Sequence, residues 1–300
     1  MIHGKEITKN MDNNKIIADL ESSGNFRVLH KLEKPDFYNR DDGVEKLQGC
    51  LIDFETTGLN PETDKIIETA IIQFEFSKDG RIFKVNNAYT GLEDPKTPLS
   101  PKIIALTGLT DPKLSGESFD TQLINKIIDP IDIIISHNAS FDRKFAEKRF
   151  PAFEKKSWGC SASQVNWENE GIASSKLEYL AYKFGFFFDG GHRAEIDAYA
   201  TLHILSKTLP SSGDSVLGVL LQNATQESYR VWAVGSDYGK KDTLKSRGYK
   251  FFWEKKIWYI EIDKENLESE LEYLKQEIYK REINLPIDTV TARDRFSARC

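Results

Sequence analysis

Five side chains in three short segments of this chain have the types and spacing of a metal-dependent hydrolytic site. Asp53 and Glu55 lie two residues apart in the segment DFETTG, and Asp142 ends the segment HNASFD. His192 and Asp197 begin and end the segment HRAEID. Hard divalent cations prefer carboxylate oxygens, and two such ions about 3.5–4 Å apart can clamp the attacking and leaving oxygens of a phosphodiester. The pattern therefore predicts a phosphodiester-cleaving metal site, provided that the fold brings the three segments together.

Asp53 and Glu55 stand at the end of an apolar run that predicts a buried strand. Side chains two residues apart on a strand point to the same face, so the two carboxylates repel each other unless a cation lies between them. The alternative is an exposed strand end with two solvated acids, the ordinary state of charged residues. Thr56, Thr57 and Gly58 favour a site, because small residues let backbone N–H groups approach a ligand.

Asp142 lies in the first turn of a helix that is predicted to follow the apolar strand 131–136. Ligands of open sheets bind beyond the carboxyl ends of the strands, which favours a functional role. An aspartate in a first turn also stabilises the helix dipole without any ligand. That alternative leaves His137 and Asn138, just before the helix, unexplained.

His192 follows Gly190 and Gly191, which predict a mobile loop that carries a general base into the site. A neutral imidazole, with an unperturbed pKa of about 6.5, can accept a proton at physiological pH. The alternative is a surface histidine without a role, and it loses weight because four carboxylates stand at matching positions. Asp197 lies within the next helix beside Ala198, where an inward-facing carboxylate needs a partner such as a metal.

The elements that must position these residues predict an α/β fold, because strands come first and helices then alternate with strands around a mixed sheet. The predicted strands are residues 50–54, 66–76, 81–89 and 131–136, with a hairpin turn at 78–80. The predicted helices are residues 101–106, 120–128, 141–149, 176–184 and 195–209. Residues 1–45 are polar and predict an N-terminal extension that packs on this domain or is partly disordered, with an aromatic anchor in residues 35–38.

The pattern changes after a predicted linker at residues 210–214, and residues 224–285 form a small α/β unit. Its predicted elements are a strand at 229–234, a helix at 241–247, a hairpin of 251–253 with 257–262, and a helical face of Leu267, Leu271, Leu274 and Ile278. Lysines and aromatic residues are interspersed between positions 240 and 259. Bases stack on exposed rings while lysines contact phosphates, so nucleic-acid binding is one interpretation of the unit. The other is that so small a unit needs its aromatic side chains as core.

Composition limits the class of protein. The 300 residues suit about two domains, and 39% hydrophobic with 29% charged residues are typical of a folded globular protein. The net charge of −6 argues against a bulk nucleic-acid coat protein but not against a nuclease, whose site is acidic until metals bind. The three cysteines lack zinc-ligand spacing, which favours a reducing compartment. No membrane-spanning run and no secretory signal core stand out, so we expect a cytoplasmic protein without a membrane partner.

Together, DFETTG, HNASFD and HRAEID resemble the three exonuclease motifs of the DEDDh (DnaQ-like) superfamily, whose best-known member type is the proofreading epsilon subunit of bacterial DNA polymerase III. The stretch LTGLT, residues 106–110, resembles the segment between the first two motifs. The resemblance covers residues 46–210 and implies a ribonuclease H-like mixed sheet flanked by helices. It also implies hydrolysis from the 3′ end to nucleoside monophosphates with two Mg²⁺ or Mn²⁺ ions per site.

The resemblance assigns a role to each matching position. It implies that His192 is the general base and that the metal ligands are Asp53, Glu55, Asp142 and Asp197. The predicted substrate-binding residues are Thr56, Thr57, Gly58, Leu106, Thr107, Asn138 and Phe141.

Three hypotheses follow for the function. The first is a 3′→5′ exonuclease acting on single-stranded DNA or on 3′ ends. The second is an RNA-trimming exonuclease or oligoribonuclease with the same site, and a comparison of DNA with RNA substrates separates the two. The third is a nucleic-acid-binding or polymerase-accessory module whose nuclease is incidental. The expected partners are DNA or RNA 3′ ends and, as an open alternative, a polymerase or another protein.

Overall fold

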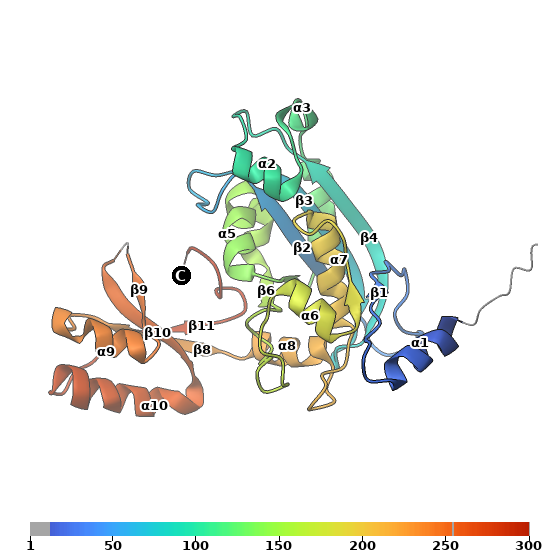
Figure 1. Cartoon of the computed structure of the whole chain (residues 1–300). Coiled ribbons are helices and arrows are strands. Elements are labelled where there is room, and N and C mark those ends of the chain that lie inside the picture. The colour runs from blue at the N-terminus through green and yellow to red at the C-terminus, as the bar shows by residue number, and fades with distance from the viewer. Residues whose placement is uncertain (1–12, 254, 300) are drawn as a thin grey trace, which may run out of the picture.

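A five-stranded mixed sheet forms the centre of the larger part of the molecule (Figure 1). The computed structural model describes residues 13–253 and 255–299. The sheet has the order β4-β3-β2-β5-β6, with bounds β2 Leu47–Thr56, β3 Ile66–Phe76, β4 Ile82–Leu92, β5 Ile133–Ser136 and β6 Ser157–Cys160. β2, β3 and β4 are antiparallel, whereas β5 and β6 run parallel to β2. The predicted α/β fold, a ribonuclease H-like mixed sheet flanked by helices, is confirmed.

Helices cover both faces of this sheet because alternate side chains of β2 point to opposite sides. Leu51 packs in the cluster that contains α6 Leu177–Lys183, α7 Ala194–Leu205 and α8 Val216–Thr225. Cys50 and Ile52 pack in the cluster that contains α4 Thr121–Ile128 and α5 Ala139–Arg149, followed by the 3₁₀ turn Pro151–Lys155. α2 Pro101–Thr107 and α3 Asp111–Leu114 contribute to a smaller cluster with Ile67.

The predicted strands and helices of this part lie close to those of the structure, and β3 has the predicted bounds. The predicted helix 195–209 instead ends at Leu205. A tight turn follows, in which the Leu209 N–H donates to the Asp214 carbonyl and the Val216 N–H donates to the Lys207 carbonyl. The four-residue strand β6 was not predicted, because it is too short to display a pattern.

The N-terminal extension packs on the larger part through its second half, where the Tyr38 N–H donates to the Phe83 carbonyl and the Val85 N–H donates to the Asp36 carbonyl. α1 Asn13–Ser22 has no buried residue, and β1 His30–Lys31 pairs in parallel with β7 Phe186–Phe187. Tyr38 packs against the core, whereas Phe37 is 71% exposed. Only one ring of the predicted aromatic anchor therefore serves that purpose.

The small C-terminal unit is a four-stranded antiparallel sheet with helices on one face (Figure 1). The strands are β8 Ser228–Ala233, β9 Lys250–Phe252, β10 Ile257–Asp263 and β11 Ile287–Val290, in the order β11-β8-β10-β9. The helical segments are the 3₁₀ turn Tyr238–Lys240, α9 Lys241–Ser246, and α10 Lys264–Tyr273 with its π-helical continuation Leu274–Tyr279. Val231, Leu244 and Leu274 share the core between the sheet and these helices.

The last described residues return from the small unit to the larger part. Trp158 in β6 donates its backbone N–H to the Ala292 carbonyl. The guanidinium of Arg143 in α5, which has no exposed surface, donates to the carbonyls of Ala292 and Arg295 at 3.2 and 2.7 Å and to that of Arg293. We call residues 291–299 the return segment.

The predicted domain boundaries, 1–45, 46–210 and 224–285, stay a prediction. Two features of the packing bear on any attempt to separate the parts. α8 buries Val216, Leu217 and Leu220 in the core of the larger part, beyond residue 210. The return segment makes hydrogen bonds to that same part. A truncation that keeps the nuclease core intact would therefore have to retain both.

None of the helices that the structure describes combines the length and apolar character of a membrane span.

Candidate active site

The acidic residues of the first motif lie at the carboxyl end of β2, next to the carboxyl end of β5. Asp53 and Glu55 share one face of β2, and Glu55 is only 8% exposed. Burial, followed by repulsion from Asp197, raises the pKa of the Glu55 carboxyl to about 8. Burial and then repulsion from Asp142 raise the pKa of the Asp53 carboxyl well above its usual range. The fold thus holds these groups where ionisation is unfavourable without a counter-charge.

Asp142 joins the group from the first turn of α5. The residue is 3% exposed, and burial raises the pKa of its carboxyl, while the polar groups around it, the Ser136 hydroxyl and backbone N–H groups, oppose that shift. The apolar strand β5 and the helix after it place this carboxyl beside β2, as the motif order predicts.

His192 and Asp197 complete the group from the start of α7. His192 has a left-handed backbone, with φ of 66°, an uncommon conformation for a residue other than glycine. This bend lets its backbone N–H donate to Asp197 Oδ2 at 2.9 Å. Burial raises the pKa of Asp197 to about 6, and that hydrogen bond partly opposes the shift. The imidazole itself is exposed.

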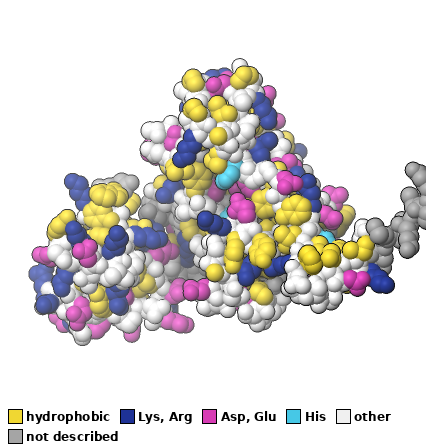
Figure 2. Space-filling view, viewed as in Figure 1, with side chains coloured by type: hydrophobic (Ala, Val, Ile, Leu, Met, Phe, Trp, Pro, Cys, Tyr) yellow, Lys and Arg dark blue, Asp and Glu magenta, His cyan; other side chains and the backbone are white. Residues whose placement is uncertain are grey.

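Side chains from all three motifs converge. One ligand atom from each of Glu55, His192 and Asp197 lies within 4.8 Å of the other two. Asp53 and Asp142 belong to the same group, because repulsion from Asp142, Asp197 and Glu55 helps to raise the pKa of Asp53, and Asp142 also helps to raise that of Glu55. Histidine and acidic side chains gather near the middle of the face that Figure 2 shows.

The residues fit a divalent cation. Four carboxylates, all with raised pKa values, supply the oxygen ligands that hard cations prefer, and a cation would offset their mutual repulsion. Asp53, Glu55, Asp142 and Asp197 would hold it.

A fifth carboxylate, that of Glu68, was not among the predicted site residues. Glu68 lies on β3 directly opposite Glu55 and is 4% exposed. Its oxygens accept hydrogen bonds from Arg193 Nε at 3.0 Å and from Arg193 Nη2 at 2.7 Å, and a weaker one from the Ala194 N–H. The ion pair therefore fixes the residue next to His192 to the central sheet. A glutamate flanked by apolar residues near the start of the strand IIETAIIQFEF was the sequence signal for it.

The small residues after Glu55 form a tight turn. Thr56 donates its hydroxyl to the Gly58 carbonyl at 2.6 Å, and the Thr57 hydroxyl accepts from the Lys65 N–H at 3.0 Å. A Cβ at Gly58 would lie 2.5 Å from the Asp64 carboxylate, so a larger residue there would displace the Asp64 side chain. The predicted contact of these residues with a terminal nucleotide stays a prediction.

The other predicted substrate-binding residues differ in their accessibility. Leu106 is 43% exposed at the end of α2, whereas Thr107 is buried and its hydroxyl bonds within the chain, to the Ile103 carbonyl and the Leu109 N–H. Asn138 is exposed at the start of α5, and the half-buried Phe141 packs its ring on Phe145. Leu106 and Asn138 are thus free to contact a ligand, while the Thr107 side chain serves the fold.

His137, which was unexplained in the sequence, links two loops at this end of the sheet. Its Nδ1 lies 2.8 Å from Ser161 Oγ, and its Nε2 lies 2.7 Å from the Ser175 carbonyl. Burial lowers the pKa of the imidazole, which favours its neutral form. The residue supports the loop between β6 and α6.

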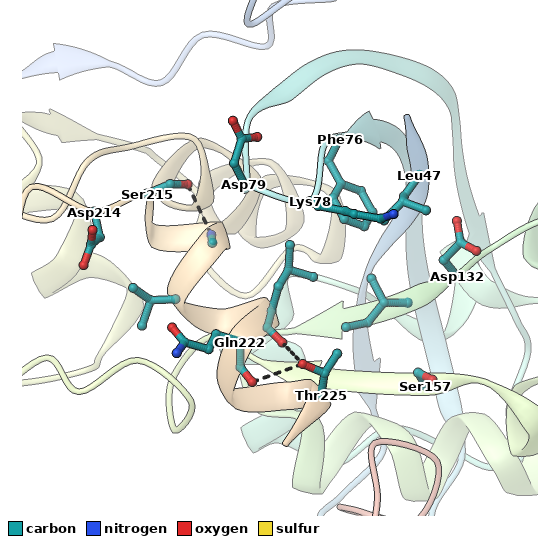
Figure 3. Close-up of a pocket in the computed structure, with 14 residues that line it drawn as sticks. Leu47, Phe76, Lys78, Asp79, Asp132, Ser157, Asp214, Ser215, Gln222 and Thr225 are labelled. Carbon is teal, nitrogen blue, oxygen red and sulfur yellow. Dashed lines mark hydrogen bonds between the residues drawn. The ribbon is translucent and has the colours of Figure 1, made fainter. Parts of the chain in front are cut away.

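A separate cavity of about 620 Å³ lies away from this site (Figure 3). Its lining includes Leu47 and Ile133, the first residues of β2 and β5, whereas Asp53 and Glu55 stand near the other end of β2. Gln222 and Thr225 of α8 form another wall. The cavity is therefore not part of the site formed by the clustered carboxylates.

Known proteins with similar sequences include the DNA polymerase III PolC-type of Halalkalibacterium halodurans, 33% identical over 164 residues that cover 52% of this chain and 11% of that protein. The corresponding protein of Bacillus subtilis is 33% identical over 178 residues, 57% of this chain and 12% of that protein. The chain therefore matches only about a ninth of the length of these relatives.

Solved structures with a similar fold include exonuclease X in complex with 5′-overhanging duplex DNA. It is 23% identical, covers 58% of this chain and 98% of that chain, and has a TM-score of 0.44.

The sequence model of the exonuclease family (RNase_T) matches residues 50–205. This range contains the five predicted catalytic and metal-binding residues, Asp53, Glu55, Asp142, His192 and Asp197. The chain belongs to this exonuclease family, within the DnaQ-like superfamily of nucleases that hydrolyse phosphodiester bonds.

Proposed function

We propose that the chain is a 3′→5′ exonuclease that removes nucleoside monophosphates from single-stranded DNA or from 3′ ends. One observation carries this proposal: Glu55, His192 and Asp197 converge within 4.8 Å, beside the half-buried carboxylate of Asp53 and the buried carboxylate of Asp142. A structural core has no use for two buried and two half-buried acids with raised pKa values, because each costs free energy when it ionises. Binding of a divalent cation for phosphodiester hydrolysis accounts for these carboxylates.

Divalent cations, held by Asp53, Glu55, Asp142 and Asp197, would supply Lewis-acid stabilisation of the charge on the phosphate. The exposed imidazole of His192 would accept the proton of the attacking water. The water oxygen bonds to phosphorus, and the bond from phosphorus to the 3′ oxygen of the preceding nucleotide breaks. That oxygen then takes a proton from solvent, and a nucleoside 5′-monophosphate leaves.

The exposed side chains near the group suit the terminal nucleotide. Leu106 is an apolar surface at the end of α2, and Asn138 has an accessible amide. We propose that Leu106 packs on the terminal base, and that Thr56, Thr57 and Gly58 line the nucleotide through their backbone.

The test is the time course of mononucleotide release from oligonucleotides labelled at the 5′ or the 3′ end, in Mg²⁺, in Mn²⁺ and in EDTA. A 3′→5′ exonuclease releases the 3′ label first and shortens the 5′-labelled strand stepwise. Asp53→Asn should abolish turnover, whereas the control Asp189→Asn, an exposed aspartate in the same loop region as His192, should not. Metal-supported activity in Asp53→Asn would refute the assigned site.

DNA and RNA oligonucleotides of equal sequence decide the substrate. Faster cleavage of RNA would favour the second hypothesis, since a 2′-OH has to be accommodated or refused. The PolC-type relatives motivate a further proposal, that a polymerase is a partner, which co-purification with the full chain would test.

A further inference from the structure

One face of the small unit's sheet carries aromatic side chains and no helix. Opposite residues of an antiparallel pair share a face, so Trp232 and Tyr259, paired in β8 and β10, lie side by side. Phe252 of β9 lies two residues along from Lys250, the partner of Tyr259, and so on the same face, with ring centroids 5.7 Å from Trp232 and 6.4 Å from Tyr259. α9 and α10 pack against the opposite face, through Val231 and its neighbours. We call the three rings the aromatic face.

The aromatic face forms one wall of a groove of about 1070 Å³ between the small unit and the larger part. The opposite wall is largely uncharged and polar, with Ser163, Gln164, Asn166 and the serines at 174 and 175. The groove also reaches Ser140 and Lys144 on α5, the helix that carries Asp142. The groove therefore extends from the small unit to α5, the helix on which Asp142 lies.

Basic side chains slightly outnumber acidic ones in the lining of this groove: Lys144, Arg230, Lys250 and Arg295 against Glu168, Glu261 and Asp263. Lys250 and Lys144 line it and are exposed, and Lys255 lies 5.0 Å from the ring centroid of Trp232. Among the described residues, none of the three lysines is in an ion pair, whereas Arg230 and Arg295 in the same groove are paired with Glu261. Apolar and basic side chains stand together on the small unit in Figure 2. Rings flanked by unpaired lysines suit bases joined by phosphates better than an apolar peptide.

The order of helices and strands in the small unit is analogous to that of known RNA-recognition modules. The unit has the sequence β8-α9-β9-β10-α10-β11, the split βαβ arrangement, and its strand order is β11-β8-β10-β9. RNA-recognition modules stack two or three bases on aromatic side chains of a four-stranded sheet. In this unit the rings stand on the uncovered face, where such stacking takes place. A fold by itself does not determine function, so support for nucleic-acid binding comes from the rings and the lysines beside them.

We infer that the aromatic face and its lysines bind single-stranded nucleic acid, and that the groove holds the part of a substrate strand that lies upstream of the 3′ end in the active site. This role rests on the proposed exonuclease function, which it extends from the terminal nucleotide to the strand behind it. Phe252 and Tyr259, both half-buried, supply the accessible ring faces, while Trp232, 6% exposed, supports them.

The experiment measures binding separately from cleavage. The full chain in EDTA is titrated against fluorescein-labelled oligothymidylates of different lengths, and the anisotropy gives the Kd. Phe252→Ala should weaken binding of the long strand roughly 5- to 100-fold, the effect of one lost base stack. Phe252→Leu, which keeps an apolar side chain in the sheet, should weaken it similarly, so that a folding defect of the alanine variant does not decide the result. The loss should shrink as the strand shortens to two nucleotides.

The lysines have an independent signature. A variant with Lys144→Gln, Lys250→Gln and Lys255→Gln should lower the slope of log Kd against log salt by roughly 2, because each phosphate contact on a single strand contributes about 0.7. Tyr238→Ala is the matched control, since Tyr238 is 80% exposed with Lys241 over its ring but lies outside the groove lining. It should change neither quantity.

Two outcomes overturn the inference. One is a long-strand Kd of Phe252→Leu equal to that of the parent, which would leave a protein as the occupant of the face. The other is an equal loss in Tyr238→Ala. Cleavage in Mg²⁺ is recorded in parallel. A parent that binds strands through the groove but cleaves none would refute the exonuclease proposal, and with it the substrate role of the groove, and would leave only single-strand binding by the aromatic face.

Discussion

Replacing Glu55 by glutamine should make the metal-free protein more stable, although the residue belongs to the most functional part of the chain. The folded-state pKa of Glu55, about 8, lies above the usual 4.5, so the folded protein holds this proton more tightly than the unfolded chain does. The group therefore stabilises the fold fully below pH 4.5, and that contribution is lost as the pH rises toward 8.

The size of the effect follows from the shift. One pKa unit corresponds to about 1.4 kcal/mol, so a rise from 4.5 to about 8 amounts to roughly 5 kcal/mol above pH 8. The neighbouring carboxylates share the repulsion and can relax, which makes roughly 2–5 kcal/mol the expected gain for Glu55→Gln. At about 2–4 °C per kcal/mol for a domain of this size, the melting temperature should rise by roughly 10 °C.

The assay is thermal unfolding of parent and variant in EDTA from pH 5 to pH 9. The difference in Tm should be small at pH 5 and grow toward pH 8. Added Mg²⁺ should stabilise the parent more than the variant, because a ligand of the ion is missing in the variant. Glu117→Gln, at an exposed loop position, is the control and should show no such trend. A parent whose stability relative to Glu55→Gln is independent of pH would refute the reasoning.

Three further predictions follow. His192→Ala should lower the rate roughly 10²–10⁴-fold with little change in metal affinity, as steady-state kinetics and metal titration would detect; a near-full rate would mean that another group takes the proton. Glu68→Gln should lower kcat roughly 10-fold with KM nearly unchanged, because it weakens the ion pair that holds Arg193 beside His192. The control Glu93→Gln, in the comparable ion pair with Arg149, should leave kcat intact. Equal effects of the two variants on kcat would contradict a positioning role of Glu68. Deleting residues 291–299 should lower the free energy of unfolding, measured in urea, by roughly 3–5 kcal/mol, because Arg143 loses three carbonyl acceptors. Arg143→Met should recover part of that lost stability in the shortened chain. Unchanged stability would contradict the structural role of the return segment.

The motif-bearing elements could be predicted from the sequence because their signals are local. β3 is rich in β-branched and aromatic residues over the predicted bounds Ile66–Phe76, and Asp120 caps α4 where the pattern begins. The convergence of Glu55, His192 and Asp197 was also expected, since it follows from the order of motifs along the sheet.

The unpredicted features depend on partners that are distant in sequence. β6 and β11 have four residues each, too few for a periodic signal, and exist because β5 and β8 offer them free edges. The Glu68–Arg193 pair joins residues 125 positions apart. A charged residue in an apolar strand indicates that some partner exists, but only the packed sheet identifies it.

The return segment has a consequence for the time at which the nuclease becomes complete during synthesis. Arg143 finds its acceptors 149 to 152 residues later in the chain. Contacts of such sequence separation form late in folding, since a long loop has to close first. Until the ribosome has delivered residues 291–299, Arg143 in the helix that carries Asp142 has Glu147 as a partner on the same helix but lacks these carbonyl acceptors. A nascent chain therefore gains its fully stabilised catalytic helix only after the small unit has been made.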